Sequence, residues 1–213
     1  LIYFSNILHS NPITAWDKAS PSVVSVLPTW PGFKKPGFGA PPGTAPEGTG
    51  IVISSLGHIL TASHVVKKAK SIEIRDINGN KFIAKLILDD PNTDLAIIKA
   101  EIDITPINIS KDKPKIASSA CLISNSFGLD LGITCGVVSA IGRKNTGFNK
   151  IENFIQTDAA ANPGSSGGAL VNKNGELIGM MSGIFTKNTD TNSGVNFAVS
   201  SELILKIIQL EIN

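Results

Sequence analysis

The sequence is poor in several kinds of residue, and each shortage excludes a class of protein. Its 213 residues include two cysteines, too few to build a disulfide scaffold. The formal net charge is only +2, which argues against a nucleic-acid or membrane-surface role. No apolar run approaches the length of a membrane span. Hydrophobic residues still make up 42% of the chain, enough for a globular protein with a large core.

Histidine is also scarce, and its placement limits the chemistry of a glycine-rich turn at Gly164–Gly168. The small residues of this turn let the backbone bend sharply and expose the hydroxyl of Ser166, but a serine needs a base to take its proton. The three histidines, His9, His58 and His64, all precede it. An α/β-hydrolase carries its acid and its histidine after the serine, so this order excludes that fold.

The order of the residues also separates the two remaining types of serine hydrolase. A subtilisin order needs an acid before the histidine, and the only aspartate ahead of His64 is Asp17, in a segment that looks peripheral. The chymotrypsin order of histidine, aspartate and serine fits His64, an aspartate in the middle of the chain, and Ser166.

Three aspartates in the middle of the chain compete for the acidic position. Asp94 directly precedes the strand-like run Leu95–Ala100, a good place for a buried, oriented carboxylate. Asp89 and Asp90 stand beside Pro91, and we interpret them as solvated turn residues. The sequence therefore predicts Asp94 as the third member of the group.

Four stretches around these residues resemble the motifs of HtrA (Deg) serine proteases, in the same order along the chain. They cover most of residues 20 to 200, so the resemblance is to the protease domain of that family, without a PDZ domain. The histidine motif is Thr61–Val66, the aspartate motif Asn92–Lys99, the intervening motif Ser124–Leu129 with Gly136–Ser139, and the serine motif Gln156–Ala160 with Asn162–Gly168.

Short strand-like runs at regular spacing predict an all-β sandwich or barrel. The resemblance implies an all-β fold of the chymotrypsin/trypsin-like kind, a double antiparallel β-barrel with a C-terminal helix. We expect residues 1–213 to form a single protease domain. Its predicted parts are an N-terminal segment at 1–19, a first barrel at 20–102, a polar connection, a second barrel at 116–200 and a helix at 201–213.

The resemblance implies a role for each residue of the site. Ser166 is the expected nucleophile, His64 its general base and Asp94 the carboxylate that orients the histidine. The backbone N–H groups of Gly164 and Ser166 are expected to form the oxyanion hole.

The substrate pocket is predicted to be small and apolar. Ala160 and Ala161 would form one side, and Gly183, Ile184 and Phe185 the opposite wall. The resemblance implies that Ala160 stands at the base of the pocket, where an acidic residue would select basic side chains. We therefore expect a preference for small or medium aliphatic residues before the cleaved bond.

The two cysteines, Cys121 and Cys135, fall on neighbouring strand-like runs and could be cross-strand neighbours. We interpret them as buried free thiols, because most cysteines behave as small hydrophobic residues. No group of histidines or cysteines has the spacing of a metal site, and we expect no cofactor.

The ends of the chain and one long loop carry further expectations. The resemblance implies a regulatory loop at residues 27–48, which contain six of the twelve prolines, and we expect poor order there. It also implies that Tyr3, Phe4 and Trp16 build a homotrimer interface, although these side chains could equally cover the domain's own surface. No membrane span and no nucleic-acid partner are expected.

The predicted function is cleavage of unfolded or damaged proteins outside the cytoplasm, as in the bacterial periplasm or an organelle of bacterial origin. Both the quality-control role and the location are implied by the resemblance. Two alternatives stay open from the sequence. One is a sensor protease that cuts a single regulatory protein, and the other is a catalytically silent chaperone.

Overall fold

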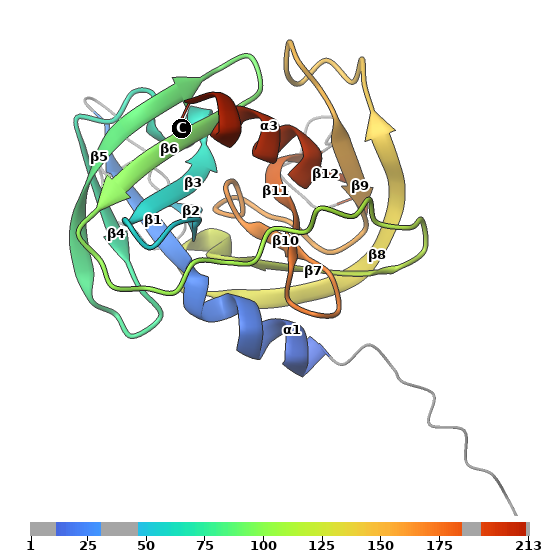
Figure 1. The fold of residues 1–213 in the computed structure, drawn as a ribbon, viewed down its shortest axis with the longest axis horizontal. Coiled ribbons are helices and arrows are strands. Elements are labelled where there is room, and N and C mark those ends of the chain that lie inside the picture. The colour runs from blue at the N-terminus through green and yellow to red at the C-terminus, as the bar shows by residue number, and fades with distance from the viewer. Residues whose placement is uncertain (1–11, 31–46, 185–192, 212–213) are drawn as a thin grey trace, which may run out of the picture.

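The computed structural model of the protein describes residues 12–30, 47–184 and 193–211. Its strands close into two barrels of six strands each, and every pairing between named strands is antiparallel. The two barrels lie side by side (Figure 1). The predicted double β-barrel fold is confirmed.

The first barrel runs in the order β1-β2-β3-β6-β5-β4. Strand β4 shows why these segments form strands: isoleucines alternate with polar residues along it, so one face is buried and the other is exposed. Its strands are β1 Val23–Thr29, β2 Gly48–Val52, β3 His58–Ala62, β4 Ser71–Arg75, β5 Lys81–Asp90 and β6 Leu95–Ala100.

The second barrel runs in the order β10-β11-β12-β9-β8-β7. Residues 103–115 lead to it from the first barrel without a regular element, as their polar composition predicts. Its strands are β7 Ser119–Ser124, β8 Gly132–Arg143, β9 Phe154–Thr157, β10 Ala169–Val171, β11 Leu177–Ile184 and β12 Asn196–Ser200.

Short helices begin, interrupt and end the described chain. Helix α3 starts where the sequence predicts, because the hydroxyl oxygen of Ser200 accepts the N–H of Leu203 at 3.3 Å and caps the first turn. The helical segments are α1 Pro12–Ala19, α2 Ser63–Val66 and α3 Ser201–Glu211, with 3-10 turns η1 Ser20–Ser22 and η2 Ser126–Gly128.

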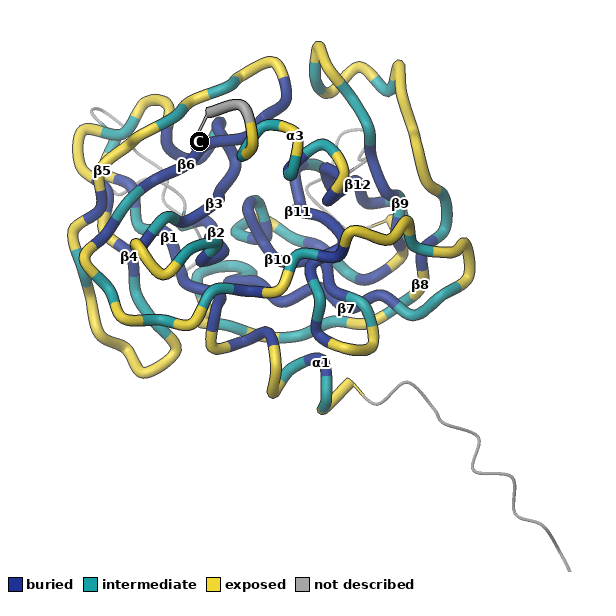
Figure 2. Tube along the Cα trace, viewed as in Figure 1, coloured by how far each residue is buried: buried dark blue, intermediate teal, exposed yellow. Residues whose placement is uncertain are grey.

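Buried residues lie along most of the strands, whereas exposed residues lie in the outer loops and along much of β5 and β8 (Figure 2). Large aliphatic side chains such as Ile51, Leu60 and Ile97 are almost fully buried in the first barrel. Leu122 and Leu170 are likewise fully buried in the second barrel. Apolar residues of the strands therefore supply the core of each barrel, and several strands, such as β2, β10 and β12, are buried along their whole length.

The expectation of two free thiols is wrong: Cys121 and Cys135 form a disulfide. The register of β7 and β8 places the two residues directly opposite each other. Side chains opposite each other on antiparallel strands lie on the same face and close together, so the two sulfur atoms can bond. The cysteine on β7 is buried and the one on β8 is exposed.

The expectation that Asp89 and Asp90 lie in a turn is also wrong. Both belong to the end of β5, and the turn is formed by the residues that follow. Asp89 accepts the hydroxyl of Ser63 at 2.5 Å. Asp90 accepts the N–H of Asn92 at 3.0 Å and the hydroxyl of Thr93 at 2.6 Å, so it caps the turn that leads to Asp94.

Candidate active site

His64, Asp94 and Ser166 come together at the seam between the barrels. Nε2 of His64 lies 2.9 Å from Oγ of Ser166, and Nδ1 lies 2.9 Å from both carboxylate oxygens of Asp94. His64 is on helix α2 and Asp94 just before β6, whereas Ser166 precedes β10 in the second barrel. The imidazole therefore bridges a carboxylate of its own barrel and a hydroxyl of the other.

The carboxylate of Asp94 is held from several sides. One oxygen also accepts the backbone N–H of His64 at 3.0 Å, and the other accepts the hydroxyl of Ser182 at 2.6 Å. The aspartate has a φ of +61°, a left-handed conformation that aspartate tolerates better than most residues. Only 10% of its side chain is exposed, so its charge is compensated almost entirely by these donors.

Ser182 is the part of this group that sequence reasoning missed. It lies on β11 between Met181 and Gly183, in a run that reads as an ordinary strand. Its hydroxyl reaches Asp94 only because the two barrels are packed together. No local signal marks it.

The turn that carries Ser166 fits closely against β2 of the first barrel. Thr49 donates its N–H to the carbonyl of Ser166 and its hydroxyl to the carbonyl of Gly164, both at 2.8 Å. Gly167 has a φ of +83°, and a Cβ there would come within 1.9 Å of the carbonyl oxygen of Thr49. Glycine is thus required by both the backbone conformation and the approach of the neighbouring strand.

The N–H groups of Gly164 and Ser166 are oriented by the carbonyls of the same peptide units. The carbonyl before Gly164 belongs to Pro163 and accepts the N–H of Phe127 at 2.6 Å. The carbonyl before Ser166 belongs to Ser165 and accepts the N–H of Gly168 at 2.8 Å. In a trans peptide the N–H points opposite to the carbonyl, so fixing these two carbonyls also fixes the two N–H directions.

The comparisons with known proteins agree with this geometry. Residues 48–180, more than half of the chain, match the family model described as "Trypsin-like peptidase domain".

The chain belongs to the trypsin-like peptidase family.

The relatives place the chain beside the HtrA proteases, as the motifs suggest. The chain is 40% identical to the periplasmic serine endoprotease DegP of Salmonella typhimurium over 161 residues, 74% of this chain and 34% of that protein. It is also 40% identical to the periplasmic pH-dependent serine endoprotease DegQ of Escherichia coli over 166 residues, 76% of this chain and 36% of that one. It thus spans about a third of the length of these curated relatives.

Solved structures give the same result. The HtrA-type protease AlgW with tripeptide superposes with a TM-score of 0.83 at 34% identity, over 93% of this chain and 62% of that one. The serine endoprotease from Yersinia pestis superposes with a TM-score of 0.78 at 33% identity, over 95% of this chain and 66% of that one.

The residues predicted for the substrate pocket of this trypsin-like domain are only partly described. Ala161 is fully buried in the cluster inside the second barrel, while Ala160 is half-buried and its carbonyl accepts the hydroxyl of Thr134 at 2.6 Å. Gly183 is half-buried on β11. The side chain of Ile184 and the whole of Phe185 lie outside the described residues.

The loop between β8 and β9 lies against both Gly183 and the turn before Asp94. The ring of Phe148 stands 3.1 Å from the position that a Cβ on Gly183 would take. The side-chain amide of Asn149 donates to the carbonyl of Thr93 at 3.0 Å. Sequence reasoning assigned this loop no part in the site.

A single carboxylate, Glu152, holds the loop together. It accepts the N–H groups of Thr146, Gly147, Phe148 and Asn149 at 2.7 to 3.1 Å, and the hydroxyl of Thr146 at 2.8 Å. Burial raises the pKa of Glu152, but the hydrogen bonds, led by those from Thr146 and Asn149, outweigh it, and the pKa lies below its ordinary value.

The other histidine of the described chain lies away from the site. His58 begins β3, and its Nδ1 lies 2.8 Å from the hydroxyl of Ser54. Burial, and next the positive charge of Lys99, lowers its pKa. His58 is thus a strand residue away from the site, whereas His9 lies outside the described residues.

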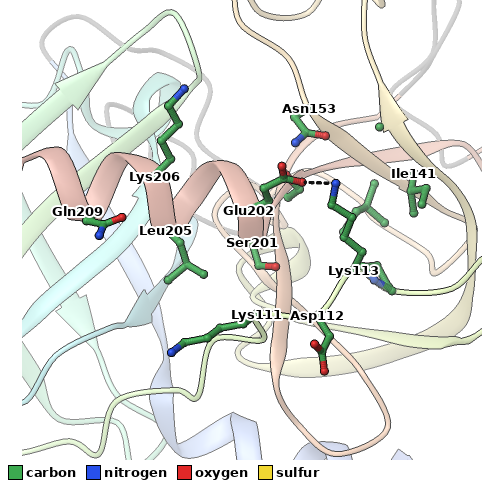
Figure 3. Close-up of a pocket in the computed structure, with 14 residues that line it drawn as sticks. Lys111, Asp112, Lys113, Ile141, Asn153, Ser201, Glu202, Leu205, Lys206 and Gln209 are labelled. Carbon is green, nitrogen blue, oxygen red and sulfur yellow. Dashed lines mark ion pairs between the residues drawn. The ribbon is translucent and has the colours of Figure 1, made fainter.

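A separate cavity of about 330 Å³ opens beside the start of α3. Figure 3 shows Lys113 and Glu202 paired across it, at 3.2 Å, with Ile141 and Leu205 among the other lining residues. The hydrogen bond and the charge of Lys113 lower the pKa of Glu202. Neither His64, Asp94 nor Ser166 lines this cavity, so it is distinct from the candidate active site.

Nothing in the described part of the chain provides a metal centre. No group of three histidine, cysteine, aspartate or glutamate side chains there could hold an ion. Among the same residues, no helix is both long and apolar enough to cross a membrane.

Proposed function

We propose that the protein is a serine endopeptidase in which Ser166 is the nucleophile, His64 the general base and Asp94 the orienting carboxylate. The single observation that carries this proposal is the unbroken series of contacts from the serine hydroxyl through the imidazole to the carboxylate, each at 2.9 Å. A serine hydroxyl attacks a peptide carbonyl only when a base accepts its proton, and the imidazole is in place to do so.

The proposed reaction has two halves. Oγ of Ser166 bonds to the carbonyl carbon while its proton passes to Nε2 of His64, and that proton then leaves with the amine as the peptide bond breaks. Water deprotonated by the same imidazole releases the acid and restores Ser166. The N–H groups of Gly164 and Ser166 would stabilise the negative oxygen in each half, where the loss of one donor costs on the order of 3 kcal/mol.

The proposed substrates are unfolded or damaged polypeptides. Support comes from the relatives named DegP and DegQ, and from the small side chains of Ala160 and Ala161 at the expected pocket. A pocket of this size favours small or medium aliphatic residues but discriminates weakly, by about 1–3 kcal/mol per methylene. No observation favours a protease restricted to one regulatory protein or a silent chaperone.

The proposed location is outside the cytoplasm. The names of the relatives support it, and so does the disulfide between Cys121 and Cys135, because disulfides persist mainly in oxidising compartments. A homotrimer through the N-terminal segment rests on the family resemblance. In this segment Trp16 packs against the core, and Tyr3 and Phe4 lie outside the described residues. The mass of the protein in solution tests the trimer.

The test of the activity is digestion of an unfolded model protein with the fragment ends mapped. Ser166→Ala should lower the cleavage rate by about 10⁶-fold, below detection, while leaving the fold intact. Ser118→Ala is the matched control, since its hydroxyl donates to the carbonyl of Lys115 at the far end of β7. Undiminished cleavage by Ser166→Ala would overturn the assignment of Ser166 as the nucleophile. An excess of Lys or Arg before the cleaved bond would overturn the proposed small, apolar pocket.

A further inference from the structure

Three serine hydroxyls meet beneath the turn that carries Ser166. Oγ of Ser165 lies 3.0 Å from Oγ of Ser124 and 2.9 Å from Oγ of Ser126, and the latter two lie 3.3 Å apart. Ser165 is 1% exposed and Ser124 4%, whereas Ser126 is half-buried. We call Ser124, Ser126 and Ser165 the hydroxyl ring.

The ring is balanced in donors and acceptors. Each hydroxyl carries one proton and can accept in return, so three protons serve the three contacts, with every member donating once and accepting once. The oxygen of Ser165 also accepts the N–H of Asn162 at 3.1 Å. Loss of one member therefore leaves one neighbour without its acceptor and the other without its donor, which is costlier at a largely buried place than the loss of a solvent-exposed hydrogen bond.

Ser165 stands between the two residues expected to form the oxyanion hole. Its side chain points away from any substrate, because it is buried against Ser124 and Ser126. Its N–H donates to the carbonyl of Asn162 and its carbonyl accepts the N–H of Gly168, both at 2.8 Å. The peptide unit that contains the Ser166 N–H is thus fixed through Ser165.

The other members of the ring belong to a well-anchored segment. Ser124 ends β7 and Ser126 begins η2, within the hairpin that the disulfide of Cys121 and Cys135 closes. Asn125, between the two serines, donates its N–H to the hydroxyl of Thr49 at 3.0 Å. A Cβ on Gly164 would come within 2.3 Å of the carbonyl oxygen of Asn125, so the turn rests directly on this segment.

We propose that the hydroxyl ring is a positioning unit for catalysis: it locks the turn 162–166 onto the β7–β8 hairpin so that the N–H groups of Gly164 and Ser166 point at the oxyanion. This deepens the proposed peptidase function and rests on it. The hydrogen bonds of the ring hydroxyls do not reach His64 or Asp94, so we expect the ring to act on the transition state through the oxyanion donors and to leave substrate binding to the pocket.

The first experiment compares Ser165→Ala and Ser126→Ala with the wild type on a peptide substrate. A displaced oxyanion donor costs up to about 10²-fold, so we expect kcat to fall by about 10- to 100-fold with KM nearly unchanged. Affinity for a peptide boronic acid, which forms a tetrahedral adduct with Ser166, should fall by a similar factor. Ser126→Thr keeps the hydroxyl and should restore most of the activity. Ser118→Ala, a half-buried serine outside the ring, should be unaffected.

The double variant Ser126→Ala/Ser165→Ala tests whether the hydroxyls act as one unit. Members of one hydrogen-bond network are not additive, so the double variant should lose little more than the worse single variant. Losses that multiply would show independent effects and overturn the proposal. If Ser165→Ala does not fold, the half-buried Ser126→Ala and its Thr rescue decide the question.

The outcomes separate this proposal from the proposed function. If the wild type cleaves, Ser166→Ala does not, and both ring variants keep the wild-type kcat, only the positioning role is overturned. A loss that appears in KM, or that leaves the affinity for the boronic acid unchanged, overturns it as well. If Ser166→Ala cleaves like the wild type, the peptidase assignment itself has failed.

Discussion

The two barrels hold their shares of the candidate site by different means. The first barrel contributes His64 and Asp94, and a nearly buried carboxylate with four hydrogen-bond contacts to His64 and Ser182 fixes them. The second barrel contributes Ser166 through a turn that is fixed by carbonyl contacts and neutral hydroxyls. The difference suggests that one half of the site depends on charge and the other on backbone geometry.

The cores of the two barrels also differ in the residue types that fill them. Four of the ten buried residues in the cluster inside the second barrel are alanines, so this cluster buries little apolar area per residue. Most buried apolar residues in the strands of the first barrel are isoleucine, leucine or valine, although Ala62, Ala84, Ala96 and Ala100 are buried there as well. The second barrel adds a disulfide between β7 and β8, in the hairpin that also carries Ser124 and Ser126. Covalent and hydrogen-bonded restraints thus support the barrel whose geometry has to be accurate.

Among the changes that test this comparison, removal of the carboxylate charge from the first barrel should have the largest effect. Asp94→Asn keeps the size of the side chain but not its charge, and an amide favours the wrong tautomer of His64. We expect kcat to fall by about 10⁴-fold, or ~5.4 kcal/mol of transition-state stabilisation, with the fold retained. Initial cleavage rates, with circular dichroism as a check on folding, measure it.

Asp103→Asn is the control for this change, because Asp103 is exposed in the connection between the barrels. It should cleave like the wild type. An Asp94→Asn variant that lost less than about tenfold would mean that charge is not what the first barrel contributes.

Loss of the disulfide should have the next largest effect, on the stability of the second barrel. Cys135 is exposed, so a reductant can reach it, and a disulfide that closes a loop of about 15 residues stabilises by roughly 3 kcal/mol. We expect the urea midpoint to drop on reduction. Hydrogen exchange should accelerate at β7 and β8 more than at β3 and β6.

The variant Cys121→Ala/Cys135→Ala separates the bond from side effects of the reductant. It should match the reduced wild type and should not respond to reductant. Equal loss of protection in the two barrels would argue against the distinction drawn between them.

The sequence predicted much of the fold and the charged half of the site because those signals are local. His64 comes just after a strand-like run, Asp94 directly precedes one, and Ser166 lies in a glycine-rich turn. Each stands within a recognisable motif, and their order along the chain excludes other hydrolase folds. The strands β4 and β6 follow from alternation and from an apolar run, respectively.

What the sequence could not show depends on register and on the packing of the barrels. A shift of one residue between β7 and β8 would separate Cys121 from Cys135, and no pattern within either strand fixes that register. Ser182 meets Asp94 only across the seam between barrels. The hydroxyl ring likewise joins Ser165 to residues about 40 positions away.

The smallest expected effect concerns Glu152, a charge placed in the second barrel. Its pKa is lowered from 4.5 in the folded protein, so its carboxylate stabilises the loop at pH values above the unfolded pKa. That contribution disappears as the pH falls through the folded pKa. Because the group is largely solvated, we expect Glu152→Gln to cost less than about 1 kcal/mol at pH 7.

The measurement is the free energy of unfolding of wild type and Glu152→Gln between pH 7 and pH 3. The free energy of unfolding of the wild type should exceed that of the variant above about pH 4.5. The difference should disappear below that pH, because protonation leaves a neutral acceptor much like the amide. Glu101→Gln, an exposed carboxylate at the end of β6, should show a smaller change. At pH 7 the variant should also raise KM slightly, since Glu152 holds Phe148 against Gly183. A difference that did not depend on pH would mean that the shape of the Glu152 side chain, and not its charge, stabilises the loop. The second barrel's side of the site would then depend on geometry alone.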